Sequence, residues 1–250
     1  MKIVLITGAS RGLGKSMALH LADKGSDVIV TYNSNAKEAA AVVAEIEKRG
    51  RKAAALQLDV SKAQTFAAFG KDVAGVLKSR WQRADFDVLV NNAGIGIHKP
   101  FAETTPDEFD TLMNIHLKGP FFLTQTLLPS MKDGGRIVNI SSGLARFSLP
   151  GYACYAAMKG GIEVLTRYQA KELGARGISA VTLAPGAIET DFGGGAVRDN
   201  KQLNAMIAAQ TALGRAGLPD DIGAALAALV SDDCRWINGQ RVEASGGMFL

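Results

Sequence analysis

Short aliphatic segments alternate with longer amphipathic segments along this chain of 250 residues. Several short segments are nearly continuous in Val, Ile and Leu, a pattern typical of strands covered on both faces of a sheet. The longer segments have helical periodicity, as in Ala36–Arg49, where Ala39, Val43 and Ile46 recur and Gly50 follows as a stop signal. We expect strands at Ile3–Ile6, Asp27–Tyr32, Ala53–Leu58, Asp87–Val90, Arg136–Ile140, Ile178–Leu183 and Gln240–Glu243.

This alternation of strands and helices predicts the fold class. Strand–helix–strand units with right-handed crossovers build a parallel sheet. The prediction is therefore an α/β fold of Rossmann type, a doubly wound parallel sheet of about seven strands with helices on both faces. No break in composition marks a boundary and no internal repeat is present, so we expect residues 1–250 to form a single domain.

Composition argues against several classes of protein. Hydrophobic residues make up 47% of the chain and charged residues 21%, which fits a globular protein rather than a disordered one. The net charge of +4 is dispersed, without the Lys and Arg clusters typical of nucleic-acid-binding proteins. Cys154 and Cys234 have no paired spacing and no neighbouring His cluster, so neither a disulfide framework nor a metal site is expected.

Hydropathy gives an expectation for location. The N-terminal run Ile3–Ile6 is too short for a signal peptide. The longest apolar stretch elsewhere, Ala224–Val230, is far shorter than a membrane span. We therefore expect a cytoplasmic protein with no membrane partner.

A glycine-rich turn follows the first predicted strand. The segment Thr7-Gly8-Ala9-Ser10-Arg11-Gly12-Leu13-Gly14 leads into a predicted helix from Lys15 to about Lys24. Glycine permits positive φ and lets the backbone approach a ligand closely, and a helix N-terminus offers unpaired N–H groups to a pyrophosphate. The position of this turn in a strand–helix unit indicates nucleotide binding, with a purely structural turn as the alternative.

The spacing Gly8-x-x-x-Gly12-x-Gly14 resembles the opening signature of the short-chain dehydrogenase/reductase family, T-G-x-x-x-G-x-G. Further signature elements follow in family order, namely Asp59-Val60, Asn91-Asn92-Ala93-Gly94, Ser142, Tyr155-x-x-x-Lys159 and Pro185-Gly186. The resemblance extends from Lys2 to the C-terminus, and it is as close to 3-oxoacyl reductases as to broad alcohol dehydrogenases. It implies hydride transfer between a nicotinamide cofactor and a keto or secondary alcohol substrate, in a homotetramer or homodimer.

The resemblance also implies which residues bind the cofactor. Most of them follow the ends of predicted strands, and Asp59 and Val60 are expected beside the adenine. Ile188 and Thr190 resemble residues that contact the carboxamide of the nicotinamide. The full predicted set is Gly8, Ser10, Arg11, Gly12, Leu13, Gly14, Tyr32, Asn33, Ser34, Asp59, Val60, Asn91, Ala93, Gly94, Tyr155, Lys159, Pro185, Gly186, Ile188 and Thr190.

The end of the second strand, Thr31-Tyr32-Asn33-Ser34, bears on which nicotinamide cofactor binds. An acidic residue there would bind the ribose 2′-hydroxyl and repel a 2′-phosphate, but no carboxylate is present. Asn33 and Ser34 can donate hydrogen bonds to phosphate, and Arg11 adds a positive charge. We predict NADPH as the preferred cofactor, with NADH as the alternative if Arg11 is an ordinary solvated turn residue.

Tyr155 and Lys159 are four residues apart and share one face of a predicted helix. A tyrosine normally titrates near pH ~10, and a neighbouring ammonium is expected to lower that pKa toward the working pH. The family resemblance adds a serine that holds the substrate oxygen, and its usual separation from the tyrosine selects Ser142, with Ser141 in a supporting role. In reduction, Ser142 would hydrogen-bond the carbonyl oxygen, Tyr155 would donate the proton, and Lys159 would tune Tyr155 and hold the nicotinamide ribose.

One position departs from the family pattern. His116 stands where the family commonly has a catalytic asparagine, and Asn114 is two residues too early to replace it. His116 either serves a proton relay or is a packed histidine without a role in turnover. His20 is expected to be a surface or packing residue, and His98 an exposed loop residue.

The segment after Pro185-Gly186 contains three consecutive glycines, Gly193 to Gly195. This composition favours a hinge or lid that closes over substrate, with a flexible surface loop as the alternative. The apolar segment Gln202–Leu213 is expected to contribute to a partly apolar substrate pocket. Three functions remain open: an NADPH-dependent carbonyl reductase, an NAD-dependent sugar or steroid alcohol dehydrogenase, and a nucleotide sensor without turnover.

Overall fold

The computed structural model describes residues 1–250, and its core is one parallel sheet of seven strands in the order β3-β2-β1-β4-β5-β6-β7. Every neighbouring pair of strands is parallel. The fold class predicted from the alternating pattern is therefore confirmed. The strands are β1 Ile3–Ile6, β2 Asp27–Tyr32, β3 Ala53–Gln57, β4 Phe86–Asn91, β5 Met131–Ile140, β6 Ser179–Pro185 and β7 Arg241–Ala244.

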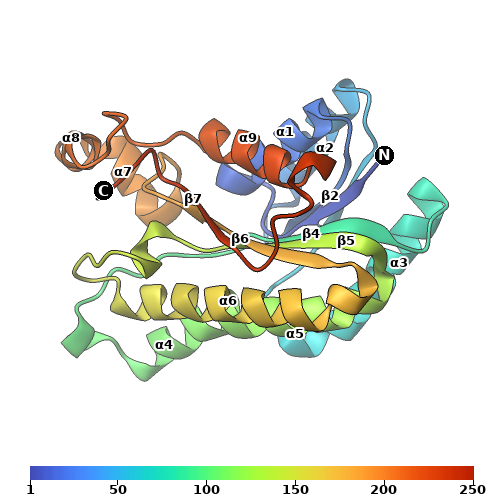
Figure 1. Cartoon of the computed structure of the whole chain (residues 1–250), viewed down its shortest axis with the longest axis horizontal. Coiled ribbons are helices and arrows are strands. Elements are labelled where there is room, and N and C mark those ends of the chain that lie inside the picture. Colours follow the sequence, from blue (N-terminus) through green and yellow to red (C-terminus); the bar gives the residue numbers. More distant parts are fainter.

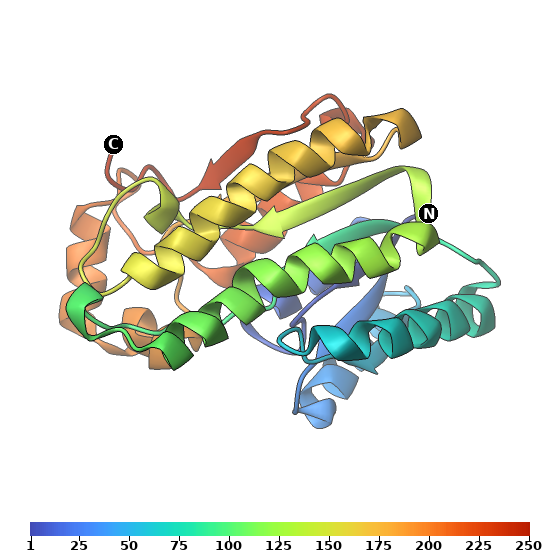
Figure 2. The ribbon, with the colours of Figure 1, turned by 90° about the horizontal axis from the view of Figure 1, so that it is seen from below.

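Helices cover both faces of the sheet. Figures 1 and 2 show α1, α2 and α9 on one face, and α3, α4, α5 and α6 on the other. Two short helices, α7 and α8, lie beyond one end of the sheet (Figure 1). The helices are α1 Gly12–Asp23, α2 Ala36–Lys48, α3 Phe66–Val76, α4 Pro106–Met113, α5 Gly119–Leu127, α6 Ala153–Glu172, α7 Ala196–Asp199, α8 Lys201–Ala209 and α9 Pro219–Leu229.

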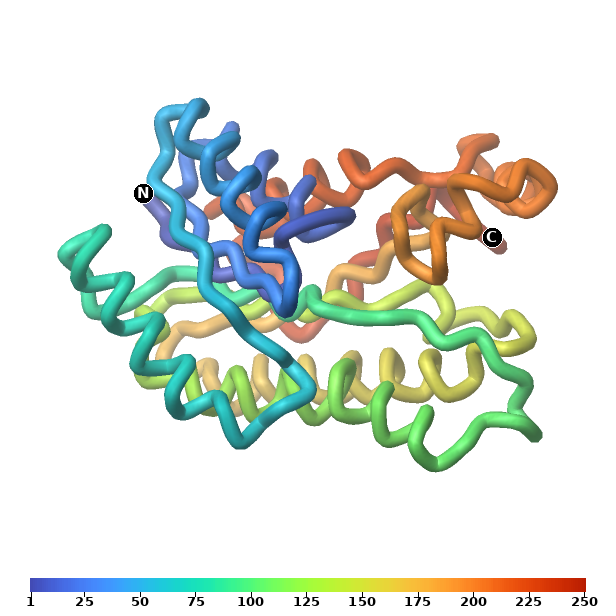
Figure 3. The backbone as a smooth tube through the Cα atoms, turned by 180° about the vertical axis from the view of Figure 1, so that it is seen from behind, coloured from blue at the N-terminus to red at the C-terminus, as the bar shows by residue number.

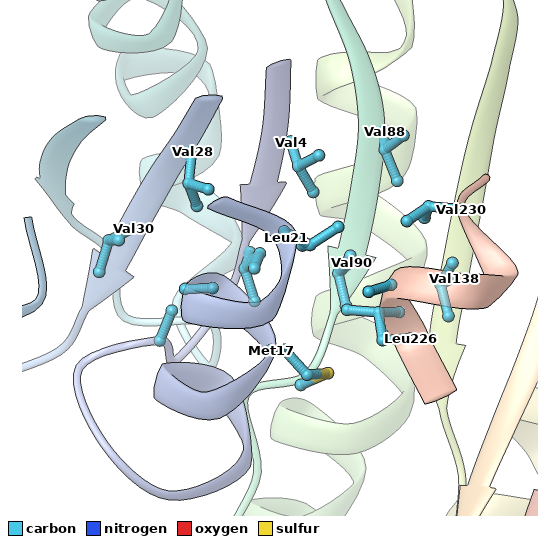
Figure 4. Close-up of a cluster of buried hydrophobic side chains, with 14 of the residues drawn as sticks. Val4, Met17, Leu21, Val28, Val30, Val88, Val90, Val138, Leu226 and Val230 are labelled. Carbon is cyan, nitrogen blue, oxygen red and sulfur yellow. The ribbon is translucent and has the colours of Figure 1, made fainter. Parts of the chain in front are cut away.

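Successive residues of the central strands supply two separate cores. Because side chains alternate between the faces of a strand, Val4 and Ile6 of β1 pack with α1, α2 and α9, whereas Ile3 and Leu5 pack with α3 and α5. Figure 4 shows part of the first core, where Met17 and Leu21 of α1 meet valines from four strands. Burial on both faces explains the continuous aliphatic runs of the sequence.

The structure moves some predicted boundaries. β5 begins at Met131, five residues before the predicted start, because Met131 pairs with Phe86 ahead of a register shift in the ladder. Helix α1 begins at Gly12 rather than Lys15, so its first turn includes two glycines of the motif. Helix α2 ends at Lys48 and buries Val42 more deeply than Val43.

Helix α1 packs closely on α9, although almost 200 residues separate them in the sequence. Gly223 makes this approach possible, because a Cβ there would lie 2.5 Å from the Ser16 hydroxyl oxygen and 2.5 Å from Nδ1 of His20. Ser16 in turn donates a 2.8 Å hydrogen bond to Asp220. His20 is thus a packing residue, as expected.

The C-terminal tail returns to the end of the molecule where α7 and α8 lie, far from the N-terminus (Figures 1 and 3). A bridge between Thr211 and Met248 ties the tail to the segment after α8. None of the helices is both long and apolar enough to span a lipid bilayer.

Candidate active site

The carboxyl ends of the parallel strands lie at one edge of the sheet and carry the predicted site residues. β1 lies between β2 and β4, and the chain changes direction across the sheet at this point. Ligands of open α/β sheets bind at such a switch point. The turns after β1 and β4 are therefore neighbours, and those after β5 and β6 extend the same edge.

The glycine turn after β1 is built for close backbone contact. Gly8 and Gly12 have positive φ, +64° and +54°. A Cβ on Gly14 would lie 2.2 Å from the carbonyl oxygen of Gly8, and a Cβ on Gly8 would lie 2.9 Å from Cα of Ala93. No side chain caps the N-terminus of α1, so its free N–H groups and partial positive charge suit a pyrophosphate. The residues present fit a dinucleotide.

Two residues that the sequence analysis left without a role hold this turn in place. The Thr7 hydroxyl accepts hydrogen bonds of 2.9 Å from the backbone N–H groups of Asn92 and Ala93. The Asn92 side chain donates to the carbonyl oxygens of Thr7 at 2.8 Å and Gly8 at 3.1 Å. Thr7 belongs to the glycine motif and Asn92 to the Asn91–Gly94 motif, so the sequence already pointed to both residues. Together they lock the turn after β1 to the turn after β4.

Asn91, which is among the expected cofactor residues, links the central strands to the helices behind them. Its side-chain amide donates to Thr124 of α5 at 3.1 Å and to Asn139 of β5 at 2.8 Å. Asn139 continues the buried network to Thr166 and Gln169 of α6, each at 2.8 Å. This chain of bonds connects β4, β5 and α6 behind the site.

The end of β2 is open to solvent. Asn33 and Ser34 are exposed, Tyr32 is half-buried, and Arg11 of the glycine turn is exposed. After β3, Asp59 accepts hydrogen bonds from the Ser61 hydroxyl at 2.6 Å and the Ser61 N–H at 3.0 Å, which fixes that turn. The residues expected to contact the adenosine half are thus at consecutive strand ends.

The turn after β6 comes close to the glycine turn after β1. Thr190 is buried, and a Cβ on Gly12 would lie 3.9 Å from Cβ of Thr190. Gly186 donates a 3.1 Å backbone hydrogen bond to Ala244, and a Cβ on Gly186 would lie 2.9 Å from Ser245. This close approach to the strand after α9 explains why glycine follows Pro185 there.

Ser142, Tyr155 and Lys159 come together after β5 and on the first turns of α6. Tyr155 and Lys159 are only 7% and 4% exposed, and the Lys159 ammonium lies 5.5 Å from the centre of the Tyr155 ring. The ammonium donates a 2.7 Å hydrogen bond to the carbonyl oxygen of Ile140. Ser142 caps a short turn, where its hydroxyl accepts a 3.2 Å bond from Leu144 N–H. One helix face thus presents the phenol and the ammonium beside the serine.

The pKa of Tyr155 differs from the sequence expectation. Burial raises the pKa of Tyr155 above its ordinary value, and a hydrogen bond with Ser142 acts in the opposite direction without cancelling it. The expected lowering of this pKa is wrong for this arrangement, because burial outweighs the influence that lowers it. The Lys159 ammonium donates its hydrogen bond to Ile140. Burial lowers the pKa of Lys159 to about 7. At neutral pH the phenol keeps its proton, which is the form that a proton donor requires.

Comparison with known proteins agrees with this geometry. A family model described as Enoyl-(Acyl carrier protein) reductase matches residues 8–249. The hydroxynaphthalene reductase-like protein Arp2 of Metarhizium brunneum (strain ARSEF 3297) is 35% identical, over 98% of this chain and 94% of its own length. A short-chain dehydrogenase/reductase from Serratia marcescens BCRC 10948 has a TM-score of 0.91 at 28% identity, over 100% of this chain and 98% of its own. This chain is a short-chain dehydrogenase/reductase.

A solved ketoreductase similar to this chain carries a nicotinamide cofactor. The angucycline C-6 ketoreductase LanV, with bound NADP, has a TM-score of 0.94 at 35% identity, and the match covers 99% of this chain and 95% of that one. The likeness therefore includes both halves of the sheet and the segments that carry the candidate site.

His116 distinguishes this short-chain dehydrogenase/reductase from the family pattern. It lies in a π-helical turn, Asn114–Lys118, between α4 and α5, a distortion that is frequent at functional sites. Its ring is edge-on to Tyr155 with centroids 5.1 Å apart. Nε2 lies 2.8 Å from the Ile95 carbonyl oxygen, whereas Nδ1 is buried without a hydrogen-bond partner. Burial, followed by the charge of Lys159, holds the pKa of His116 well below its ordinary value.

Gly94 makes room for this histidine. A Cβ on Gly94 would lie 2.6 Å from Cε1 of His116. The glycine that ends the Asn91–Gly94 motif and the unusual histidine are therefore fitted to each other. This contact is not predictable from the sequence, because it depends on a π-helical turn that no local pattern predicts.

Phe192 packs beside Tyr155, a contact that no sequence motif predicts. The two rings are 5.6 Å apart, and Phe192 remains 42% exposed. A Cβ on Gly96 would lie 2.7 Å from the Phe192 ring. Phe192 precedes the three glycines, all with positive φ of +62° to +80°. An aromatic side chain on a glycine-rich loop thus borders Tyr155.

The remaining candidates make contacts of other kinds. His98 is exposed and packs against Tyr152 with ring centroids 4.9 Å apart. Within Gln202–Leu213, Ile207 packs with Ala216 and Met248 in a small cluster near the C-terminal tail. Cys154 and Cys234 form no disulfide.

Proposed function

We propose that this chain is an NADPH-dependent ketoreductase that uses Ser142, Tyr155 and Lys159. The observation that carries the proposal is the convergence of these three side chains at the sheet edge that also holds the glycine turn. NADPH would supply the hydride, held by the glycine turn, Asn33, Ser34 and the residues after β3, β4 and β6. The NADP bound to LanV supports this cofactor, as does the lack of a carboxylate at the end of β2.

Each side chain has a separate task in this mechanism. The Ser142 hydroxyl holds the carbonyl oxygen, and the buried phenol of Tyr155 donates its proton to that oxygen as negative charge develops there. Preorganised donors of this kind stabilise developing charge strongly in a site that excludes water. Lys159, with a pKa lowered to about 7 by burial, can give up and regain a proton near neutrality and so return one toward Tyr155.

The substrate that the site favours is a ketone next to an aromatic ring system. Phe192 lies against Tyr155 and offers an aromatic surface for stacking. The names of Arp2 and LanV describe reductases of hydroxynaphthalenes and angucyclines. A bicyclic aromatic ketone such as β-tetralone is therefore expected to be reduced with a higher kcat/KM than an acyclic ketone.

A substrate panel tests the reaction class. NADPH oxidation is followed with β-tetralone, a 3-oxoacyl thioester and an enoyl thioester, and NAD reduction is followed with a sugar alcohol. Reduction of β-tetralone that is lost in Ser142→Ala supports the proposal. Turnover of the enoyl thioester alone, or oxidation of the sugar alcohol with NAD alone, contradicts it. NADPH binding without turnover of any compound would favour a nucleotide sensor.

Cofactor choice is tested by titrating the protein with NADPH and with NADH. The fluorescence of the reduced nicotinamide reports binding. Because a charge-assisted hydrogen bond contributes about 1.5–3 kcal/mol, NADPH should bind roughly tenfold more tightly or better. Arg11→Gln should remove most of that preference and leave NADH binding unchanged. Tighter binding of NADH than of NADPH by the parent protein would reject NADPH as the cofactor.

We also propose that His116 completes the proton path. Its neutral ring offers the Nδ1 lone pair at a buried position beside Tyr155, and Lys159 lies close enough to influence its charge. His116→Ala is expected to lower kcat by roughly 10- to 100-fold, less than the loss of a direct proton donor. His116→Asn, which restores the common family residue, should recover part of the activity. Full turnover by His116→Ala across the pH range excludes the relay.

The proposal extends to the number of domains and the oligomeric state. We expect one domain, because strands from both ends of the chain share one sheet. We also expect a homotetramer or homodimer, because α5 and α6 run alongside each other (Figures 1 and 2) and expose Phe121, Phe122 and Tyr168. Exposed apolar clusters of this kind commonly mark protein interfaces. Light scattering coupled to size-exclusion chromatography measures the mass of the assembly.

A further inference from the structure

A network of charged side chains lies next to Ser142 and has no part in the mechanism described so far. Arg241 and Glu243 of β7 point to the same face of the strand, since they are two residues apart. The Arg241 guanidinium donates a 2.7 Å bond to Glu163 of α6 and a 2.6 Å bond to Glu243. Arg241 is only 22% exposed, so this pairing is screened by solvent less than a surface pair.

The same guanidinium reaches the catalytic turn. Its third contact is a 3.2 Å hydrogen bond from Nη2 to the carbonyl oxygen of Ser142. Glu163, which Arg241 holds, also accepts a 2.7 Å bond from the Ser141 hydroxyl. Both serines at the end of β5 are therefore connected to Arg241, Ser142 directly and Ser141 through Glu163. Arg241 lies on β7, two strands away from β5 in the sheet.

The geometry points to Arg241 as a positioning residue that fixes the Ser142 turn for proton transfer, an inference that rests on the proposed function. The planar fork of a guanidinium bonds three acceptors at fixed angles, which a lysine ammonium on a flexible stem does not reproduce. The Ser142 carbonyl also accepts a 3.1 Å bond from Ala145 N–H, so Arg241 clamps the base of the turn that carries the hydroxyl. A displacement of about 1 Å in a reacting group can cost roughly 100-fold in rate.

The clamp also includes the C-terminal tail. Arg146, at the end of the Ser142 turn, forms two 2.8 Å bonds to Glu243. It also donates to the carbonyl oxygens of Met248 at 2.6 Å and Phe249 at 3.2 Å. The Phe147 and Phe249 rings pack with centroids 4.7 Å apart. Glu243 thus joins Arg241 to Arg146, and the tail becomes part of the support for Ser142.

Two substitutions of Arg241 and a matched control test this role. Arg241→Met removes the charge, whereas Arg241→Lys keeps it for Glu163 and Glu243 but loses the fork that reaches Ser142. Both should lower kcat by roughly 10- to 100-fold with β-tetralone, with the dissociation constant of NADPH changed less than about twofold. Arg176→Met is the control, because Arg176 likewise pairs with a carboxylate, Asp133, and two backbone carbonyls, far from the site. The control should keep the parent kcat.

Combination with Ser142→Ala separates positioning from general support of the fold. If Arg241 acts through Ser142, Arg241→Lys should lower kcat in the parent but change it less than twofold in the Ser142→Ala background. An equal loss in both backgrounds, or a parent-like kcat for folded Arg241→Lys, overturns the inference. If instead Ser142→Ala itself keeps the parent kcat, the proposed function fails first. Thermal unfolding midpoints show that each variant is folded.

Discussion

The two halves of the site are held in place by different means. In the half that includes the glycine turn, backbone geometry determines the shape. The turn is shaped by glycines with positive φ, by the strand ends and by the bonds of Thr7 and Asn92 to main-chain atoms. On the catalytic side, side chains from α6, β7 and the C-terminal tail converge on Ser142. The first half is local and steric, whereas the second depends on charge and on contacts between distant segments.

This difference teaches where each half is vulnerable. A steric cradle fails when atoms are added, and a charged clamp fails when atoms are removed. Substitutions that add a methyl group should therefore damage cofactor binding, while truncations should damage the rate of the chemical step and leave the cofactor bound.

Loss of the phenol should give the largest effect. Tyr155→Phe keeps the ring contacts with His116 and Phe192 but removes the proton donor. We expect kcat to fall about 1,000-fold, within the range for general acid catalysis, with NADPH affinity nearly unchanged. Steady-state kinetics and fluorescence titration measure the two quantities, with Tyr152→Phe as the control that keeps its activity. A Tyr155→Phe enzyme as fast as the parent would show that the active site lies elsewhere.

Addition of one methyl group to the glycine turn should act on the other half. In Gly14→Ala, the new Cβ would lie 2.2 Å from the Gly8 carbonyl, so the turn must shift. We expect about 1–3 kcal/mol of lost stability from overpacking and a loss of NADPH binding of roughly 100-fold. Gly75→Ala is the control, because nothing lies within 4 Å of its Cβ and helix propensity predicts a gain of about 0.5–1 kcal/mol. Urea unfolding compares the two, and equal stabilities would argue against a steric cradle.

The pH dependence probes Lys159, for which we propose a part in both cofactor binding and proton transfer. Burial lowers its pKa to about 7, so kcat/KM for NADPH should fall about tenfold per pH unit above that value as the ammonium is lost. Lys159→Met should lack this decline. Stability changes in the opposite sense: between pH 7 and 10.5 the unfolded chain binds more protons, so the cofactor-free protein should become more stable as pH rises. A parent profile parallel to that of Lys159→Met would contradict this assignment.

The smallest effect is expected in the loop that follows Phe192. Gly193 has a φ of +62° and free space around it, so Gly193→Ala should cost roughly 1 kcal/mol of backbone strain and no clash. If the loop closes over substrate, kcat and KM for the ketone should shift together by about two- to fivefold. NADPH affinity should stay constant in a titration. Unchanged kinetics for the ketone would identify a surface loop rather than a lid.

The fold was largely predictable because each of its decisive signals is local. Aliphatic runs such as Ile3–Ile6 predict buried strands, and the glycine motif predicts the first turn. The early start of β5 at Met131 was not predictable, because the segment Lys132-Asp133-Gly134-Gly135 has no strand character of its own and joins the ladder through a register shift.

Only the residues of the candidate site that lie in sequence motifs were predictable. Tyr155 and Lys159 share a helix face as their spacing indicates, but the raised pKa of the tyrosine follows from burial, which the spacing does not reveal. Arg241 lies almost 100 residues from Ser142, and Phe192 meets Tyr155 across a loop. Such contacts follow from the completed topology rather than from any segment.

The close packing of α1 on α9 has a consequence for the order of folding. Helix α1, which follows the glycine turn, packs mainly on α9, a segment almost 200 residues later in the chain. Gly223 permits this close approach. During synthesis the chain must therefore be nearly finished before this pair can form, and such long-range pairing slows folding. A ribosome-bound fragment that ends before Pro219 should fail to bind dinucleotide even though it already contains every residue of the glycine turn.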